Sequence, residues 1–242
     1  MAKQFFKNFP EIKVTLDSGK VVRIKDFFRK SKIEQEAVNA IVEYTKYEIV
    51  DGERPDILAT KLYGSGDLHW TFFLVNDFEN YYDWHKDNAT FEKYINTKYN
   101  GLVITANSST DIVSRNAATG AVTKFLLGED VTSISGKGNI IHLMPEKKQI
   151  VVDGKGFTTT ETLTGKISGA SFTPKSVIDH RDAPSYYKKA DGTRTNVPTT
   201  DYVAVSNYDH EYEHNEEKRT IKIIKPSLIN GIVKKFEQVM SS

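Results

Sequence analysis

Residues 44–84 read YTKYEIVDGERPDILATKLYGSGDLHWTFFLVNDFENYYDW, and this stretch carries the densest structural signal in the chain. Residues 47–50 predict a short strand that ends at an Asp-Gly turn. A helix is expected next, with Pro55 in its first turn, where a missing N–H is tolerated, and Gly64 at its end.

A second helix is predicted at residues 68–75, after a capping Ser-Gly-Asp sequence. Its sequence, LHWTFFLV, leaves almost no polar face, and such a helix is buried or contacts a partner. We therefore expect a strand–helix–helix unit that a returning strand completes before residue 100.

The segments outside this unit give weaker signals. Residues 12–24 alternate apolar and polar side chains around a Gly-containing turn, which predicts a hairpin, and a weak helical stripe follows at 33–43. Residues 179–207 are polar and contain Pro and Gly, so they are interpreted as a long linker. A strand is expected at 220–224, and an amphipathic helix that begins at Pro226 is expected to dock on its own domain or on a partner.

Residues 101–178 have a different composition, with short β-branched runs separated by Gly, Thr and Ser. Two segments within them, 125–136 and 157–169, share the pattern F-x3-E-x-(V/L)-T followed by I-S-G. Two copies are too few for a solenoid, so a duplicated hairpin that closes a small barrel or sandwich is the preferred interpretation.

These signals predict an α+β chain with four parts. They are a strand-helix-helix-strand domain, an all-β module with a duplicated hairpin, and flanking segments at either end. The expected boundaries are 1–43 for the N-terminal hairpin and helix, 44–100, 101–178, and 179–242 for the linker, strand and C-terminal docking helix.

Composition excludes several classes of protein. Hydrophobic residues make up 38% of the chain and charged residues 27%, which is ordinary for a folded soluble domain and too apolar for disorder. The net charge of +1 gives no electrostatic reason to expect nucleic acid or an anionic membrane as a partner. Because cysteine is absent, disulfides and thiolate metal sites are excluded. The N-terminal sequence MAKQFFKNFP lacks a signal-peptide core, so we expect a protein that is made and kept inside a cell unless it leaves as part of a larger particle.

One catalytic motif is formally present. His210, Glu211 and His214 satisfy H-E-x-x-H, which binds zinc when both histidines lie on one face of a helix. Rings and carboxylates alternate strictly from 208 to 214, however, and a period of two predicts a strand. In a strand the histidines would lie about 13 Å apart, too far to share a metal. A solvated strand or loop is favoured over catalysis or adventitious metal binding.

No other enzyme template fits, and we expect no catalytic residue, no cofactor and no metal. The sequence contains no G-x-S-x-G elbow and no P-loop. Aromatic residues at 81–84 could stack sugars or bases, but core packing is the commoner role beside helices this apolar.

The strand–helix–helix unit resembles a lysin-motif fold through Tyr47-Glu48-Ile49, Asp51-Gly52-Glu53, a helix to Tyr63-Gly64 and a helix to Asn76-Asp77, and so implies a lysin-motif-like strand-helix-helix-strand domain. A more specific resemblance, to the wedge protein of T-even-like myovirus baseplates that carries a lysin-motif-like domain, rests on a larger set: Glu53-Arg54-Pro55-Asp56, Leu62-Tyr63-Gly64, Trp70, Val75-Asn76-Asp77, Tyr82-x-Trp84 and the ending 215–224. The module 101–178 has no counterpart in a compact member of that family and is interpreted as an insertion.

The resemblance implies a structural virion protein, assembled in the bacterial host cytoplasm, that helps join wedges into the six-fold ring around the tail hub. The implied partners are other wedge and hub-proximal tail proteins. The alternative is a peptidoglycan- or chitin-binding lysin-motif protein, but the Gly-Asp-Thr typical of sugar-binding members is replaced here by Gly-Glu-Arg-Pro. Buried aromatic side chains dominate binding energy at interfaces. The candidate interface residues are Arg54, Trp70, Phe73, Tyr82, Trp84, Ile232 and Phe236.

Overall fold

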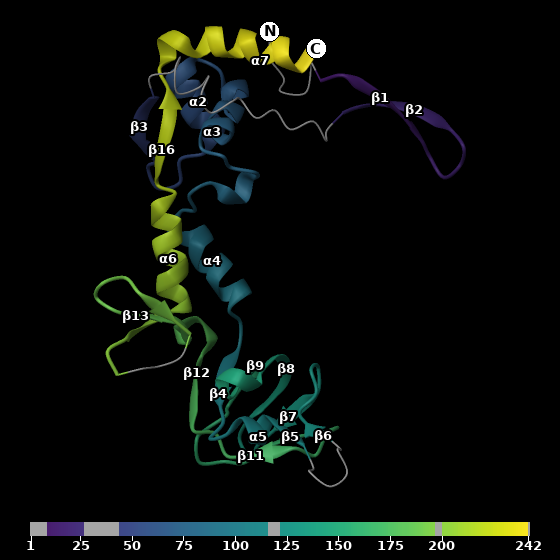
Figure 1. Ribbon diagram of the computed structural model, residues 1–242, viewed down its shortest axis with the longest axis vertical. Helices are drawn as coiled ribbons and strands as arrows, with labels where there is room; N and C mark the ends of the chain where they lie inside the picture. Colours follow the sequence, from purple (N-terminus) through teal and green to yellow (C-terminus); the bar gives the residue numbers. More distant parts are fainter. Residues whose placement is uncertain (1–8, 27–43, 116–121, 197–199, 242) are drawn as a thin grey trace. The chain divides into compact units, whose positions relative to one another are not determined.

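A computed structural model describes residues 9–26, 44–115, 122–196 and 200–241 (Figure 1). The chain separates into two compact units. Unit 1 comprises Met1–Asn88 and Asn215–Ser242, and unit 2 comprises Ala89–His214. Unit 1 is therefore built from both ends of the chain, with unit 2 inserted between them.

The elements of unit 1 are mostly those that the sequence predicts. They are β1 (Glu11–Thr15), β2 (Val21–Lys25), β3 (Tyr44–Glu48), α2 (Pro55–Tyr63), α3 (Trp70–Val75), β16 (Thr220–Ile224) and α7 (Ile229–Ser241), with short 3-10 turns at Gly66–Leu68, Tyr81–Asp83 and Pro226–Leu228. Helix α2 starts at Pro55 and ends at Gly64, whose left-handed φ of 73° lets its N–H donate to the carbonyl of Thr60. Both predicted helices between 55 and 75 and the hairpin at 11–25 are confirmed. The helix expected at 33–43 lies outside the described residues.

The strand that pairs with β3 is β16, so the expectation of a returning strand before residue 100 is wrong. The two strands are antiparallel and form five residue pairs, from Glu48 opposite Thr220 to Tyr44 opposite Ile224. Residues 76–87 contain only a short 3-10 turn and no strand. A local hydrophobic pattern identifies a strand but not its partner, and here the partner lies beyond the inserted unit.

Helices α3 and α7 contribute to one hydrophobic core in unit 1 together with β16. The buried side chains include Leu58, Trp70, Phe72, Trp84, Ile221, Ile223, Ile229, Val233 and Phe236. The rings of Trp70 and Phe236 lie 4.4 Å apart between centroids. The C-terminal helix therefore docks on its own unit, which settles the choice that the sequence leaves open.

Unit 2 contains a seven-stranded antiparallel sheet with the order β11-β10-β7-β8-β9-β4-β12. Its strands are β4 (Leu102–Thr105), β7 (Asp130–Thr132), β8 (Lys137–Met144), β9 (Gln149–Lys155), β10 (Leu163–Gly165), β11 (Ser171–Phe172) and β12 (Ser176–Asp179). A short helix α5 (Ser109–Ile112) and a ribbon of β5 (Val113–Arg115) and β6 (Val122–Lys124) accompany it. The expected β module is confirmed as a sheet, but hydrogen bonds do not close the sheet into a barrel.

The sequence predicts a linker at residues 179–207, and this prediction is wrong. The segment contains a second, three-stranded sheet. Its order is β14-β13-β15, with β13 at Pro184–Lys188, β14 at Arg194–Thr195 and β15 at Val203–Ser206. Only Tyr186 and Val205 among these strand residues are buried. With at most one buried apolar side chain in each strand, the alternation is too short to be recognised among the surrounding Pro and Gly signals.

The two copies of the repeated sequence meet toward one edge of the large sheet, where β10 and β7 are neighbours. Strand β7 belongs to the first copy and β10 to the second, and Thr132 lies opposite Thr164. These threonines occupy equivalent positions in the repeat. The antiparallel pairing therefore relates the two copies by a local two-fold axis.

Each copy holds the loop of the other through a glutamate. The Glu129 carboxylate, whose residue is 1% exposed, accepts hydrogen bonds from the backbone N–H groups of Leu126, Ile167 and Ser168 and from the Ser168 hydroxyl, at 2.6–3.1 Å. The equivalent Glu161 accepts from the hydroxyls of Ser133 and Ser135 and from the Ser135 N–H, at 2.6–2.8 Å. We refer to this exchange as the glutamate clamp.

The clamp is an acid-sensitive interaction. Burial by itself would raise the pKa of Glu129, but its hydrogen bonds from Ser168, Leu126 and Ile167 outweigh burial and lower it. Hydrogen bonds from Ser135 and Ser133 lower the pKa of Glu161. A folded-state pKa below the unfolded value stabilises the fold at pH values above the unfolded pKa, and this contribution is lost as the pH falls through the folded pKa.

We expect Glu129→Gln to lower the free energy of unfolding of unit 2 by about 1–3 kcal/mol, because an amide nitrogen would face N–H groups that need an acceptor. Glu161→Gln should have a smaller effect, since that carboxylate is more exposed. Urea denaturation at pH 7 measures both losses, with the exposed Glu146→Gln as control. The Glu129 variant should also lose less stability than the wild type between pH 6 and pH 3. Equal losses in that range would contradict the clamp.

Candidate interaction surface

The H-E-x-x-H motif lies on a helix, so the predicted strand at 208–214 is wrong. Helix α6 spans Asn207–Glu217. Tyr208 and the exposed Tyr212, four residues apart on the helix, stack on each other, and both contact the Phe91 ring edge-on. That i, i+4 tyrosine pair is the helical signal that sequence reasoning missed, because the strict alternation masks it.

The helical spacing does not assemble a metal site among the described residues, where no group of three potential ligands is present. The ring of His210 packs edge-on against Tyr186 at 5.4 Å between centroids, and His214 is exposed. Zinc sites in proteins usually need at least three protein ligands.

Glu211, the acid of the motif, is part of an ion cluster with helix α4 (Asn88–Lys98). Its carboxylate accepts hydrogen bonds from Lys98 Nζ at 2.8 Å, from the Tyr99 hydroxyl at 2.8 Å and from the Tyr94 hydroxyl at 2.9 Å. Burial and the hydrogen bond to Glu211 raise the pKa of Tyr99 to about 12. For Glu211 burial raises the pKa, but the three donors outweigh it and lower the pKa. The glutamate therefore joins α4 to α6.

The predicted interface aromatics divide by burial. Trp70, Trp84 and Phe236 are 4–7% exposed and belong to the core of unit 1. These three side chains pack inside the unit and do not lie on its surface, where an interface was expected. Phe73 and Ile232 are partly buried and pack against that core. The indole N–H of Trp84 donates to the carbonyl of Glu53 at 2.9 Å, which ties the turn at 81–83 to the loop before α2.

The two remaining candidates are exposed. Tyr82 is 78% exposed, and the side chain of Arg54 is 63% exposed. Three further hydrophobic residues near Arg54 or Tyr82 in the sequence are also exposed, and the prediction missed them: Val50, Ile57 and Tyr81. We call these five residues the exposed loop surface. They come from the β3–α2 loop, the first turn of α2 and the turn at 81–83.

The exposed loop surface has a rigid base. Tyr47 donates its hydroxyl proton to the Glu53 carboxylate at 2.9 Å, and Lys61 Nζ donates to the Tyr47 oxygen at 3.0 Å. Arg54 forms two parallel hydrogen bonds of 3.0 Å with Asp56. Bidentate pairs of this kind fix side-chain orientation, so Arg54 is held in place at the surface.

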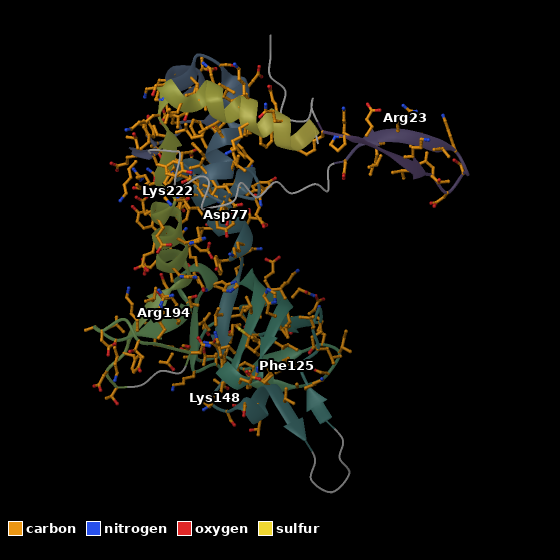
Figure 2. All side chains as sticks on the ribbon, turned by 45° about the horizontal axis from the view of Figure 1, so that its top comes forward. Arg23, Asp77, Phe125, Lys148, Arg194 and Lys222 are labelled. Atoms are coloured by element: carbon orange, nitrogen blue, oxygen red, sulfur yellow. The ribbon has the colours of Figure 1, made fainter. Side chains whose placement is uncertain are left out.

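Two asparagines join the sequence blocks that lie on either side of the insertion. Asn76 Oδ1 accepts from the N–H of Lys222 at 2.8 Å and Asn76 Nδ2 donates to the Lys222 carbonyl at 2.9 Å, so its amide continues the pattern of a β ladder. Asn215 makes the same two-point pairing with the backbone of Lys86, at 2.9 Å each. The labelled side chain of Lys222 locates this region of β16 in Figure 2.

In the described part of the chain, no helix is both long enough and apolar enough to cross a bilayer. Residues 3–114 match the family model described as base plate wedge protein 53. A search of curated proteins finds no match to the chain. The family match supports a phage baseplate wedge protein, a structural component of the virion tail, and it includes the whole exposed loop surface.

We expect Glu211→Gln to destabilise unit 2 by about 1.5–3 kcal/mol, because hydrogen bonds to a charged group are lost and Lys98 is left without its carboxylate partner. Thermal unfolding followed by circular dichroism measures the loss, with the exposed Glu213→Gln on the same helix as a control for helix propensity. If the motif were a metalloprotease site, Glu211→Gln would leave the stability unchanged and the purified chain would bind one zinc ion per molecule. Elemental analysis of the purified chain would detect that zinc.

Proposed function

We propose that the chain is a structural subunit of a contractile-tail baseplate wedge that helps join neighbouring wedges into the six-fold ring around the tail hub. The family match over residues 3–114 is the observation that carries the proposal. The implied partners are other wedge proteins and hub-proximal tail proteins. The implied location is the tail baseplate of the virion, assembled in the bacterial host cytoplasm.

The proposal includes a lysin-motif-like domain that is assembled across the insertion. In this interpretation β3, α2 and α3 supply the strand-helix-helix part, and β16 supplies the second strand. The two-point pairing of Asn76 with Lys222 supports this arrangement, because it ties the segment after α3 to the outer edge of β16. The inserted module is then an elaboration that leaves the domain's core complete.

The exposed loop surface is the proposed contact with neighbouring subunits. Tyr and Arg are enriched among residues that dominate binding energy, and preorganised side chains lose less entropy on binding. Arg54 and Tyr82 would make direct contact. Trp70, Phe73, Trp84, Ile232 and Phe236 would support that surface from the core.

Sugar binding is the less favoured alternative. In the loop where sugar-binding lysin motifs typically have Gly-Asp-Thr, Glu53 already bonds to Tyr47 and Lys61, and Arg54 to Asp56. The polar groups of this loop are therefore engaged within the fold.

The test is affinity purification of the tagged full-length chain from phage-infected cells, followed by mass spectrometry. We expect tail baseplate proteins in stoichiometric amounts with the wild type. The double variant Arg54→Ala/Tyr82→Ala should recover at least about tenfold less, equivalent to about 1.4 kcal/mol of binding free energy. It should remain folded, because both side chains are exposed.

The control is Ile134→Ala, which removes an even more exposed apolar side chain of unit 2 and lies outside the family match. Its recovery should equal that of the wild type. Recovery of the wild-type chain alone, combined with pelleting on purified cell-wall sacculi above an albumin control, would replace the wedge proposal with the sugar-binding one.

A further inference from the structure

The hairpin of β1 and β2 has two faces of different chemistry. Pairs Ile12–Ile24 and Val14–Val22 lie opposite each other on one face, which is entirely β-branched and apolar. The other face carries Glu11–Lys25, Lys13–Arg23 and Thr15–Val21. Successive residues of a strand point to opposite faces, so the separation follows directly from the register.

The apolar face is not part of any buried cluster among the described residues. Its four side chains are partly exposed. Strands β1 and β2 pair only with each other within the described part of the chain. A two-stranded hairpin is marginally stable in water, and a third strand or a packing surface is needed to stabilise it.

The opposite face contains an unfavourable electrostatic pair. Lys13 and Arg23 are both exposed and lie directly across from each other, and like charges at this position are destabilising. Neither forms an ion pair with any described residue. The side chain of Arg23 is labelled on the hairpin in Figure 2. Residues 11–25 carry four basic and two acidic side chains. An acidic partner would remove this repulsion.

We propose that the hairpin is a docking arm that enters a cleft of another baseplate protein. One wall of that cleft is apolar and covers Ile12, Val14, Val22 and Ile24, and the other is acidic and pairs with Lys13 and Arg23. A protein fits both requirements, since nucleic acid would satisfy the charge but leave the isoleucines and valines in water. The inference rests on the proposed function, and the hairpin lies within residues 3–114 of the family match.

Two full-length variants test the two faces separately. Lys13→Glu/Arg23→Glu reverses the charged face, and Val14→Thr/Val22→Thr makes the apolar face polar with little change in shape or strand propensity. Their matched controls are Lys234→Glu/Lys235→Glu on the exposed side of α7, with the same change in net charge, and Val21→Thr on the charged face. We expect both test variants to recover at least about tenfold less of the tail proteins that co-purify with the wild type, and both controls to recover wild-type amounts.

A photo-crosslinking residue at the exposed Leu16 identifies the occupant in the same infected cells. The crosslinked peptide should come from a tail protein and lie beside clustered Asp and Glu. Crosslinking only to this chain, or to a basic peptide, would overturn the inference.

The thermal midpoint of each purified variant should equal that of the wild type. A fall on Val14→Thr/Val22→Thr would mean that the chain itself covers the apolar face, and the docking arm would be rejected. If both variants recover as much tail protein as the wild-type chain does, the docking arm is rejected and the proposed wedge function is retained. Failure of the wild type to recover tail proteins would reject both.

Discussion

The pairing of β3 with β16 is the constraint on which unit 1 depends. The two strands are 172 or more residues apart along the chain, yet every residue of β3 has a partner in β16. Ile221, Ile223 and Ile224 of β16 are buried, and α7 follows directly to place Phe236 against Trp70. Without β16, unit 1 would lose the second strand of its sheet and a large part of its core together. Asn76 reinforces the junction with hydrogen bonds to the backbone of Lys222 in β16, and Asn215 does so with hydrogen bonds to the backbone of Lys86.

Closing unit 1 in this way makes the insertion of unit 2 physically tolerable. Unit 2 has a hydrophobic core of its own around Ile104, Phe125, Ile140 and Leu163. Its strands β7 and β10 are joined by the glutamate clamp, in which each of two equivalent carboxylates binds the loop of the other copy across a local two-fold axis. A buried carboxylate is stable only when donors surround it, and here the serine hydroxyls and backbone N–H groups of the two copies supply those donors. An internally stabilised module can be added to a chain without changing the residues of its host domain.

Local features of this chain could be predicted from sequence, and long-range ones could not. Pro55 and Gly64 mark the ends of α2 because their backbone preferences are intrinsic. The partner of β3 was misassigned because strand pairing depends on the whole fold. The strand predicted at 208–214 is a helix because the tyrosine stripe of α6 has the helical period that the alternating rings and carboxylates obscure. Aromatic candidates such as Trp70 and Phe236 could be recognised as energetically important, but their burial required the tertiary structure.

The most direct test of this architecture is a disulfide between β3 and β16. Lys46 and Lys222 lie directly opposite each other and are exposed, and the chain has no cysteine of its own. In Lys46→Cys/Lys222→Cys, opposed Cβ atoms about 4.5–5.5 Å apart allow a bond after a small adjustment. Mild oxidation should give an intramolecular disulfide in most molecules, detected by a mass lower by two hydrogen atoms. The out-of-register pair Lys46→Cys/Thr220→Cys should form far less. Equal yields from the two pairs, or bonds only between molecules, would contradict the account.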